Sequence, residues 1–243
     1  MIFRPINSGA RVVVVDMDLH LGEIALGLGM SATFSIADAL LNAERLDGDF
    51  LSTLLLRHSS GLAVLGSPEE YRFSHFYTHE GASKLFRILR EEFDYVVVDA
   101  GTSHGHLQEA LFEAADKLYL ITELTLPALR NAHRLISYLG TRDEKRCVEV
   151  VLNRYNSRQG DIDEQSAIKA IGRPVNWRIP NSYAAARAAQ DNGVPLAMEN
   201  SPITKALVQM ARVACGKSPD VEKKAGLGFS FFGSKNVAET LET

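Results

Sequence analysis

The sequence predicts an α/β protein with a doubly wound, mostly parallel sheet and helices on both faces. Two observations lead to this prediction. Short runs of β-branched residues alternate along the chain with segments of helical periodicity, which is the order of elements from which such sheets are built. Three of the runs, Val12–Val15, Val96–Val98 and Val148–Leu152, are apolar at successive positions, as in parallel strands that are buried on both faces.

The individual elements follow from these patterns. Strands are expected at Arg11–Val15, Leu62–Leu65, Tyr95–Val98, Leu118–Thr122, Val148–Leu152 and Val175–Ile179. Amphipathic helices are expected at Ser35–Asn42, Phe50–His58, Gly81–Phe93, Leu107–Ala115, Pro127–Leu139, Ile162–Ile171, Tyr183–Asn192 and Ile203–Cys215. Several carry helix signals: Asp161 precedes one, Pro127 lies in the first turn of another, and Gly140 and Gly193 end two more.

Composition narrows the class of protein. The 243 residues are 46% hydrophobic and 23% charged, which excludes disorder and allows one large core. A net charge of −4 provides no bulk attraction to nucleic acid or to an anionic membrane. The sequence has neither a long apolar run that could span a membrane nor the apolar stretch of a secretory signal. Cys147 and Cys215 are expected to be buried free thiols, which fits the cytoplasm.

Acidic residues follow two of the expected parallel strands. Asp16 and Asp18 come after the first strand, and Asp99 comes directly after Val98. Ligands of doubly wound sheets bind beyond the carboxyl ends of the strands. Carboxylates at that edge can hold a hydrated Mg²⁺ beside phosphate groups. The alternative, of about equal weight for either residue alone, is that Asp16 and Asp99 only cap the turns that follow them.

Six short segments, spread over about four-fifths of the chain, carry a resemblance to one protein family. They are Val15–Glu23, Phe93–Asp99, Leu126–Ala132, Leu152–Arg154, Ile179–Asn181 and Asn192–Leu196. In this order they resemble the MinD/ParA family of P-loop ATPases. The first is similar to the family's switch I region and the second to its Walker B strand. The third is similar to a stretch typical of the CpaE/TadZ branch, which is associated with assembly of tight-adherence (Flp-type) pili.

The resemblance implies ATP and Mg²⁺ as cofactors and assigns roles to individual residues. Asp18 and Asp99 would be catalytic, and Asp99 would hold the Mg²⁺ through a water molecule. The residues implied in nucleotide binding are Asp16, Gly22, Asn153, Arg154, Pro180 and Asn181. The family dimerises around nucleotide, so a homodimer is implied, with Arg130 and Asn131 on the dimer or partner surface.

The resemblance also implies proteins of a pilus or secretion machine as partners. It places the protein in the cytoplasm, at the inner face of the membrane or at the cell pole. Nucleic acid is not expected as a partner. Three functions remain open: localisation or assembly of a pilus, a scaffold that works without nucleotide, and a partitioning ATPase of the MinD/ParA type.

The 243 residues contain no Walker A loop, the glycine-rich turn with a lysine that holds phosphates in this family. The family places this loop ahead of the switch I strand, and only ten residues precede Arg11. The first strand–loop–helix unit is therefore expected to be absent, and the chain is expected to hydrolyse little or no ATP. It is either a fragment of a longer protein or a pseudo-ATPase. Ala100–Ser103 and Ser182 also depart from the family pattern.

Two further sequence patterns resemble binding motifs, but structural explanations are favoured for both. Ala211–Ser218 satisfies a relaxed P-loop pattern, but an amphipathic helix runs into it, so Gly216 is expected to end that helix. Histidine pairs at 75/79 and 104/106 lack the further ligands that a zinc site needs.

The expected organisation is a leader over residues 1–10, an ATPase-fold domain over 11–216 that is incomplete at its N-terminus, and a tail over 217–243. In the tail, Phe229, Phe231 and Phe232 could contact a membrane or a partner groove. An unstructured tail is the alternative.

Overall fold

A computed structural model describes residues 9–70, 77–101, 105–140, 147–156 and 162–218. The predictions for Asp161, for His75 and His104, and for the tail residues Phe229, Phe231 and Phe232 lie outside these ranges, as do residues 1–8.

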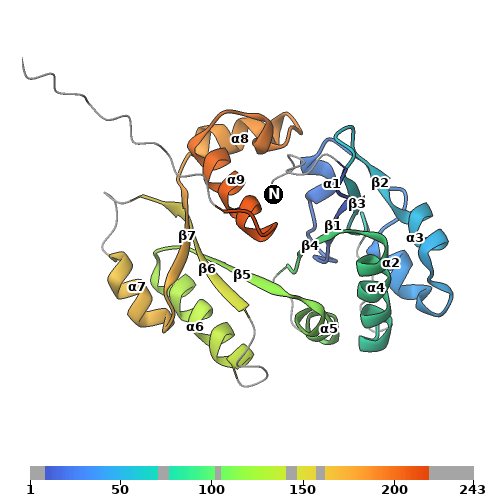
Figure 1. Cartoon of the computed structure of the whole chain (residues 1–243), viewed down its shortest axis with the longest axis horizontal. Helices are drawn as coiled ribbons and strands as arrows, with labels where there is room; N and C mark the ends of the chain where they lie inside the picture. Colours follow the sequence, from blue (N-terminus) through green and yellow to red (C-terminus); the bar gives the residue numbers. More distant parts are fainter. Residues whose placement is uncertain (1–8, 71–76, 102–104, 141–146, 157–161, 219–243) are drawn as a thin grey trace, which may run out of the picture.

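The described strands form two sheets that lie on opposite sides of the view in Figure 1. The first sheet has the order β2-β3-β1-β4, and the second has the order β5-β6-β7. Every pairing is parallel except that of β2 with β3. The strands are β1 (Val12–Asp16), β2 (Leu56–Arg57), β3 (Ala63–Leu65), β4 (Tyr95–Asp99), β5 (Lys117–Thr122), β6 (Cys147–Tyr155) and β7 (Val175–Pro180). The mostly parallel α/β class is confirmed, but the sheet is divided between β4 and β5.

The described helices follow the expected order along the chain, except that α1 was not predicted. They are α1 (Ile24–Gly27), α2 (Ile36–Leu41), α3 (Gly48–Leu54), α4 (His79–Glu92), α5 (His106–Ala114), α6 (Leu126–Gly140), α7 (Glu164–Ile171), α8 (Tyr183–Asp191) and α9 (Pro202–Ala214). The prediction of a helix over Phe50–His58 was wrong in its bounds. The helix starts earlier because the Asp47 side chain caps it, and it ends earlier because the chain enters β2. The cap of α7 is Asp163, whose carboxylate accepts the N–H of Ser166.

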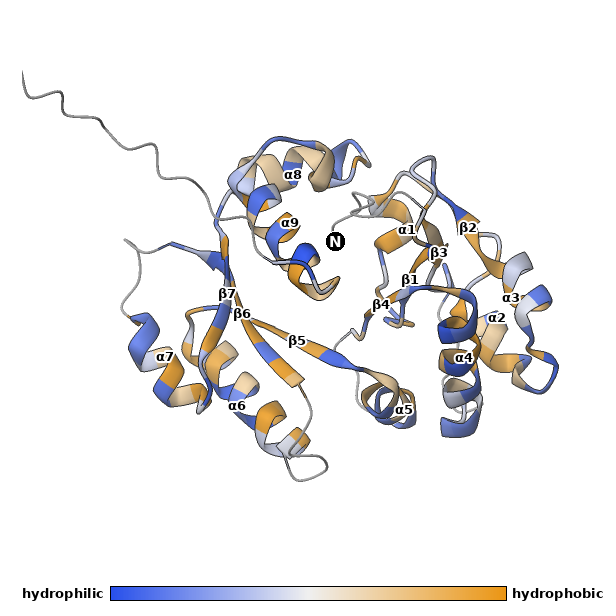
Figure 2. Cartoon of the chain, viewed as in Figure 1, coloured by the Kyte–Doolittle hydropathy of each residue, from blue (hydrophilic) through white to orange (hydrophobic). Residues whose placement is uncertain are grey.

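Helices cover both faces of each sheet, so the doubly wound arrangement is confirmed. In the first sheet Val13 and Val15 face the cluster formed with α2 to α5, whereas Val14 faces a second cluster beside α1. In the second sheet Val150 packs towards α6 and α7, and Val151 packs towards α9. Figure 2 shows hydrophobic residues gathered along the strands, while the visible face of α4 is largely hydrophilic.

Two predictions of burial were wrong. Val96–Val98 were expected to be buried on both faces, but Val97 is 41% exposed because β4 is the outermost described strand of its sheet. The cysteines are free, as predicted, but Cys147 is exposed and Cys215 is half-buried. Each of them stands at the end of an element, Cys147 as the first residue of β6 and Cys215 directly after α9, where the packing of the core has ended.

The end of α9 confirms the interpretation of Ala211–Ser218 as a helix stop. Gly216 adopts a left-handed conformation with φ of 71°. The N–H of Lys217 donates to the carbonyl of Arg212, which closes the last turn as in a Schellman motif. In the part of the chain that the structure describes, no helix is long and apolar enough to cross a membrane.

Candidate functional site

The loop that follows β1 is organised by the buried carboxylate of Asp16. This side chain is 1% exposed, and its two oxygens accept different backbone N–H groups: Oδ1 from Asp18 at 3.1 Å and Oδ2 from Ile24 at 3.1 Å. Burial raises the pKa of Asp16 above its ordinary value, although these two backbone hydrogen bonds act in the opposite direction. Asp16 therefore ties the two ends of the loop together.

Asp18 and Asp99 lie beside Asp16 at the carboxyl edge of the first sheet. Asp16 and Asp99 are direct partners in the parallel register of β1 and β4, and the N–H of Met17 donates to the carbonyl of Asp99 at 2.9 Å. Oδ1 of Asp18 accepts from His20 and Leu21. The Asp99 side chain is exposed, and its Oδ1 accepts from the N–H of Gly101 at 3.1 Å.

The two loops are packed against each other through glycine. Gly101 has φ of 60°, and a Cβ added there would lie 3.1 Å from the Cβ of Asp18. The structure thus brings together the three acidic residues that were predicted to share a site. Within the described residues no three His, Cys, Asp or Glu side chains form a cluster that could hold a metal alone. A Mg²⁺ here would require oxygen ligands from a phosphate as well.

Gly22 and Ser67 close the other side of the same loop. The Ser67 hydroxyl donates to the carbonyl of Gly22 at 2.9 Å. A Cβ at Gly22 would come within 2.3 Å of Ser67 Oγ and 2.5 Å of Asp16 Oδ2, so this close approach requires glycine. Gly22 was among the predicted site residues, whereas Ser67 was missed. Its position shortly after β3, at the same edge of the sheet, is the one signal that could have found it.

A second polar group lies at the carboxyl edge of the β5-β6-β7 sheet. Arg154, near the end of β6, has φ of 51°, the single positive value among the described non-glycine residues. Its N–H donates to Asn153 Oδ1 at 2.9 Å, and its guanidinium lies 3.4 Å from the Glu123 carboxylate after β5. The N–H of Asn181 donates to the carbonyl of Tyr155 at 3.0 Å.

These contacts join the ends of β5, β6 and β7, so Asn153, Arg154, Pro180 and Asn181 lie together at this edge. Glu123 was missed, as was Thr122, whose buried Oγ1 has no hydrogen-bond partner in the described part of the chain. Arg130 and Asn131 are exposed on α6, which begins four residues after β5 ends.

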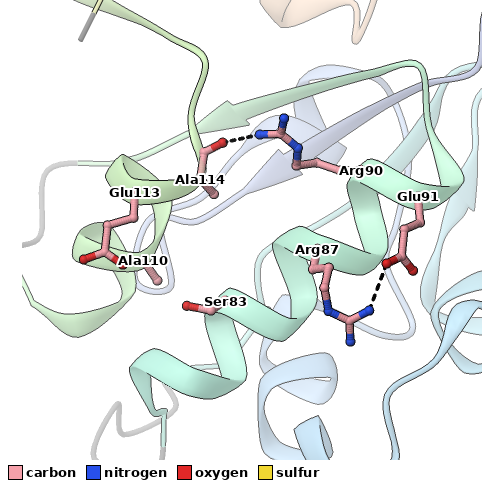
Figure 3. A pocket seen from close by; sticks show the side chains of 7 residues that line it. All are labelled: Ser83, Arg87, Arg90, Glu91, Ala110, Glu113 and Ala114. Carbon is pink, nitrogen blue, oxygen red and sulfur yellow. Dashed lines mark hydrogen bonds and ion pairs between the residues drawn. The ribbon is translucent and has the colours of Figure 1, made fainter. Parts of the chain in front are cut away.

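The hollow drawn in Figure 3 does not belong to this edge. It lies between α4 and α5 and is lined by Ser83, Arg87, Arg90, Glu91, Ala110, Glu113 and Ala114. Its basic side chains are already paired: Arg87 with Glu91 at 2.9 Å, and Arg90 with the carbonyl of Ala114. Because α4 leads into β4 and α5 leads into β5, this hollow lies towards the amino ends of the strands, away from the acidic residues.

A mostly parallel, doubly wound fold with acidic loops at the carboxyl ends of its strands has the architecture of the α/β class in which ligands bind at that edge of the sheet. No protein-family model matches the chain. It is 25% identical over 238 residues to the septum site-determining protein MinD of Helicobacter pylori, covering 92% of this chain and 86% of that protein. The chain is thus similar in sequence to MinD proteins of the MinD/ParA family of P-loop ATPases.

Solved structures of the family show the same fold. The structure of a ParA family ATPase from Chlorobium tepidum matches with a TM-score of 0.76 and 29% identity, over 84% of this chain and 85% of that one. The MinC:MinD cell division protein complex of Aquifex aeolicus matches with a TM-score of 0.71 and 21% identity, over 88% of this chain and 87% of that one. MinD of Pyrococcus horikoshii, complexed with Mg-ADP, matches with a TM-score of 0.70 and 18% identity, over 85% of this chain and 84% of that one.

Proposed function

We propose that the protein is a MinD/ParA-type positioning protein that recognises a magnesium nucleotide at the carboxyl edge of its strands. The observation that carries the proposal is the register of β1 and β4, which sets Asp16 beside Asp99 and packs Asp18 against Gly101. The relatives support it: MinD of Pyrococcus horikoshii is complexed with Mg-ADP, and that of Aquifex aeolicus with the cell division protein MinC.

The donor set fits a hydrated Mg²⁺ that is shared with phosphate groups. Both carboxylate oxygens of Asp16 accept backbone N–H groups, so the role of Asp16 is to hold the loop in place. The exposed Asp99 and the neighbouring Asp18 would hold the ion through water, and the bound ion would neutralise phosphate charge. Asn153 and Asn181, at the ends of β6 and β7, would present hydrogen-bonding groups to the base.

We expect the 243-residue polypeptide to bind Mg-ADP weakly and to hydrolyse ATP at a negligible rate, because its sequence contains no lysine-bearing phosphate loop after a strand. Asp99→Asn should weaken Mg-ADP binding about tenfold, since a charge-assisted contact is lost. Titration of a fluorescent ADP analogue with and without Mg²⁺ measures this change.

Asp49→Asn, an exposed carboxylate in the first turn of α3, is the matched control and should bind like the parent protein. Equal affinity of the Asp99→Asn variant and the parent would contradict the site. ATP turnover that Asp99→Ala abolishes would contradict a scaffold that works without nucleotide.

A second candidate function is the localisation or assembly of a tight-adherence pilus or secretion machine. It is favoured by the segment Leu126–Ala132, which forms the start of α6. Leu126 is 75% exposed there, and Arg130 and Asn131 are exposed beside it. An exposed leucine next to a charge is a suitable contact for a second copy of the chain or for a protein of the machine.

Arg130→Glu tests this surface. We expect the variant to keep the parent's unfolding midpoint, because Arg130 is exposed, and to lose self-association about tenfold in sedimentation measurements with Mg-ATP. Arg173→Glu, another arginine of the second half of the chain, serves as the charge control. Unchanged association of the Arg130→Glu variant would exclude this face of α6 from the dimer.

A further inference from the structure

We propose that the hollow between α4 and α5 binds the aromatic segment of the protein's own tail, which contains Phe229, Phe231 and Phe232. The hollow is the one drawn in Figure 3, and the tail segment lies outside the described residues. The proposal rests on the size and charge of the hollow, on the composition of the tail and on its reach. It is independent of nucleotide binding.

The hollow has room for aromatic side chains. Its volume is about 390 Å³, within the range of ~300–1,000 Å³ that is usual for binding pockets. Three of the side chains that line it are small: Ser83 on α4, and Ala110 and Ala114 on α5. Because these side chains are short, space remains between the two helices (Figure 3).

Two arginines of α4 line the hollow with planar groups that are held in place. The Arg87 guanidinium donates to the Glu91 carboxylate at 2.9 Å. That of Arg90 donates to the carbonyl of Ala114 and, at 3.1 Å, to Asp116 Oδ1 (Figure 3 shows the first of these contacts). These bonds use N–H groups in the guanidinium plane, so the charges are compensated while the faces of the planes can stack on rings. The hollow therefore suits aromatic side chains better than a phosphate or a carboxylate.

The charge on the α5 side of the hollow favours a basic occupant. α5 carries acidic side chains, among them Glu113, but no lysine or arginine, and the exposed Asp116 follows it. In the tail, residues 225–234 have no charged side chain, and the charged residues that flank them are Lys224 and Lys235. An aromatic segment between two lysines is thus complementary to a hollow with an acidic border.

The tail starts close enough to reach the hollow. The Cys215 thiol, directly after α9, is hydrogen-bonded to the Tyr95 hydroxyl at the start of β4, a contact that raises the pKa of Tyr95. Because α4 leads into β4, Glu91 lies within ~15 Å of Tyr95. Residues 219–228 lie between the described chain and Phe229, and a stretch of that length spans up to ~35 Å when extended. A segment tethered in this way acts at about millimolar effective concentration.

Docking removes the three phenylalanines from water. A phenylalanine buries ~150–250 Å² when it is fully enclosed, so even partial burial of three rings is favourable. The docked tail would hold these rings on the protein's own surface. A membrane or a partner groove would then have to compete with the hollow for them.

Disulfide trapping in the full chain tests the contact. The background carries Cys147→Ser and Cys215→Ser, which removes the native thiols. The pair Ser83→Cys and Ser230→Cys then places one thiol in the hollow and one between the phenylalanines. With copper phenanthroline as the oxidant, this pair should form an intramolecular disulfide about tenfold faster than a control pair, Ser52→Cys with Ser230→Cys. Ser52 is exposed on α3, away from the hollow.

A labelled peptide that copies residues 224–235 provides a second measurement, by fluorescence anisotropy. It is added to the full chain in which the three tail phenylalanines are replaced by serine, so that the tail does not compete. Arg87→Ala should weaken peptide binding about fivefold, because one stacking face is lost. Arg57→Ala, which removes an exposed arginine on β2, should leave the affinity unchanged.

Three results would overturn the proposal. The first is equal trapping rates for the two cysteine pairs, which would place the tail elsewhere. The second is trapping that yields linked dimers and rises with protein concentration, which would assign the hollow to the tail of a second copy. The third is an affinity that neither Arg87→Ala nor serine in place of the peptide's phenylalanines changes, which would leave only the attraction of its lysines to the acidic side chains.

Discussion

Gly22→Ala is expected to lower the free energy of unfolding by about 3 kcal/mol, the upper range for overpacking a closed site. The added methyl group would lie 2.3 Å from Ser67 Oγ, 2.5 Å from Ser67 Cβ and 2.5 Å from Asp16 Oδ2. Neither partner can withdraw easily, because both are buried and Asp16 is tied to the backbone at both oxygens. Urea unfolding followed by circular dichroism measures the loss.

Gly27→Ala is the matched control for this substitution. Gly27 lies five residues further on, as the last residue of α1, and a Cβ there would meet nothing within 4 Å. Alanine should therefore stabilise the protein by about 0.5 kcal/mol through its better helix propensity. Equal stabilities of the two variants would show that the Gly22 loop is loosely packed.

Asp16→Ala is expected to lower the free energy of unfolding by about 3 kcal/mol. The substitution leaves the partly buried N–H groups of Asp18 and Ile24 without their acceptor, and each unpaired donor costs about 1–3 kcal/mol when water cannot replace the acceptor. Asp163→Ala removes an exposed carboxylate that caps α7 through Ser166 and should cost about 1 kcal/mol. Guanidinium unfolding measures the loss of stability in both variants. It distinguishes a buried carboxylate that joins the two ends of a loop from one that caps a helix. Similar losses would contradict this role of Asp16.

The effect of Asp16 on the pH dependence of stability provides an independent check of its burial. Because burial raises its pKa in the folded state, the folded protein retains the proton to a higher pH than the unfolded chain does. The stability contributed by Asp16 therefore falls as the pH rises from its pKa in the unfolded chain to its pKa in the folded protein. Above the folded-state pKa this contribution no longer changes with pH. Asp16→Asn does not titrate, so its stability relative to the parent should increase across that window. A flat difference between about pH 3 and pH 8 would contradict the burial argument.

Most of the elements could be predicted because their signals are local. The valine run of β1 predicted a strand buried on both faces, and the structure has Val13 to Val15 fully buried. Asp18 and Asp99 could be placed at one edge because parallel strands end at the same side of a sheet. The short strand β2 was missed, since two residues carry no detectable period. Ser67 was missed because its contact with Gly22 joins positions 45 residues apart.

The amino-acid sequence alone established the order of strands and helices, the acidic ends of β1 and β4, and the helix stop at Gly216. Each of these depends on neighbouring residues and their periodicity. Only the tertiary structure showed that both carboxylate oxygens of Asp16 accept hydrogen bonds from the backbone of its own loop. It also showed that Val97 and Ile121 remain exposed where the strands divide into two sheets. The physical reason is that the burial of a strand depends on which strands pair with it. That pairing involves distant segments, so a similar run of valines is buried in β1 and only partly buried in β4.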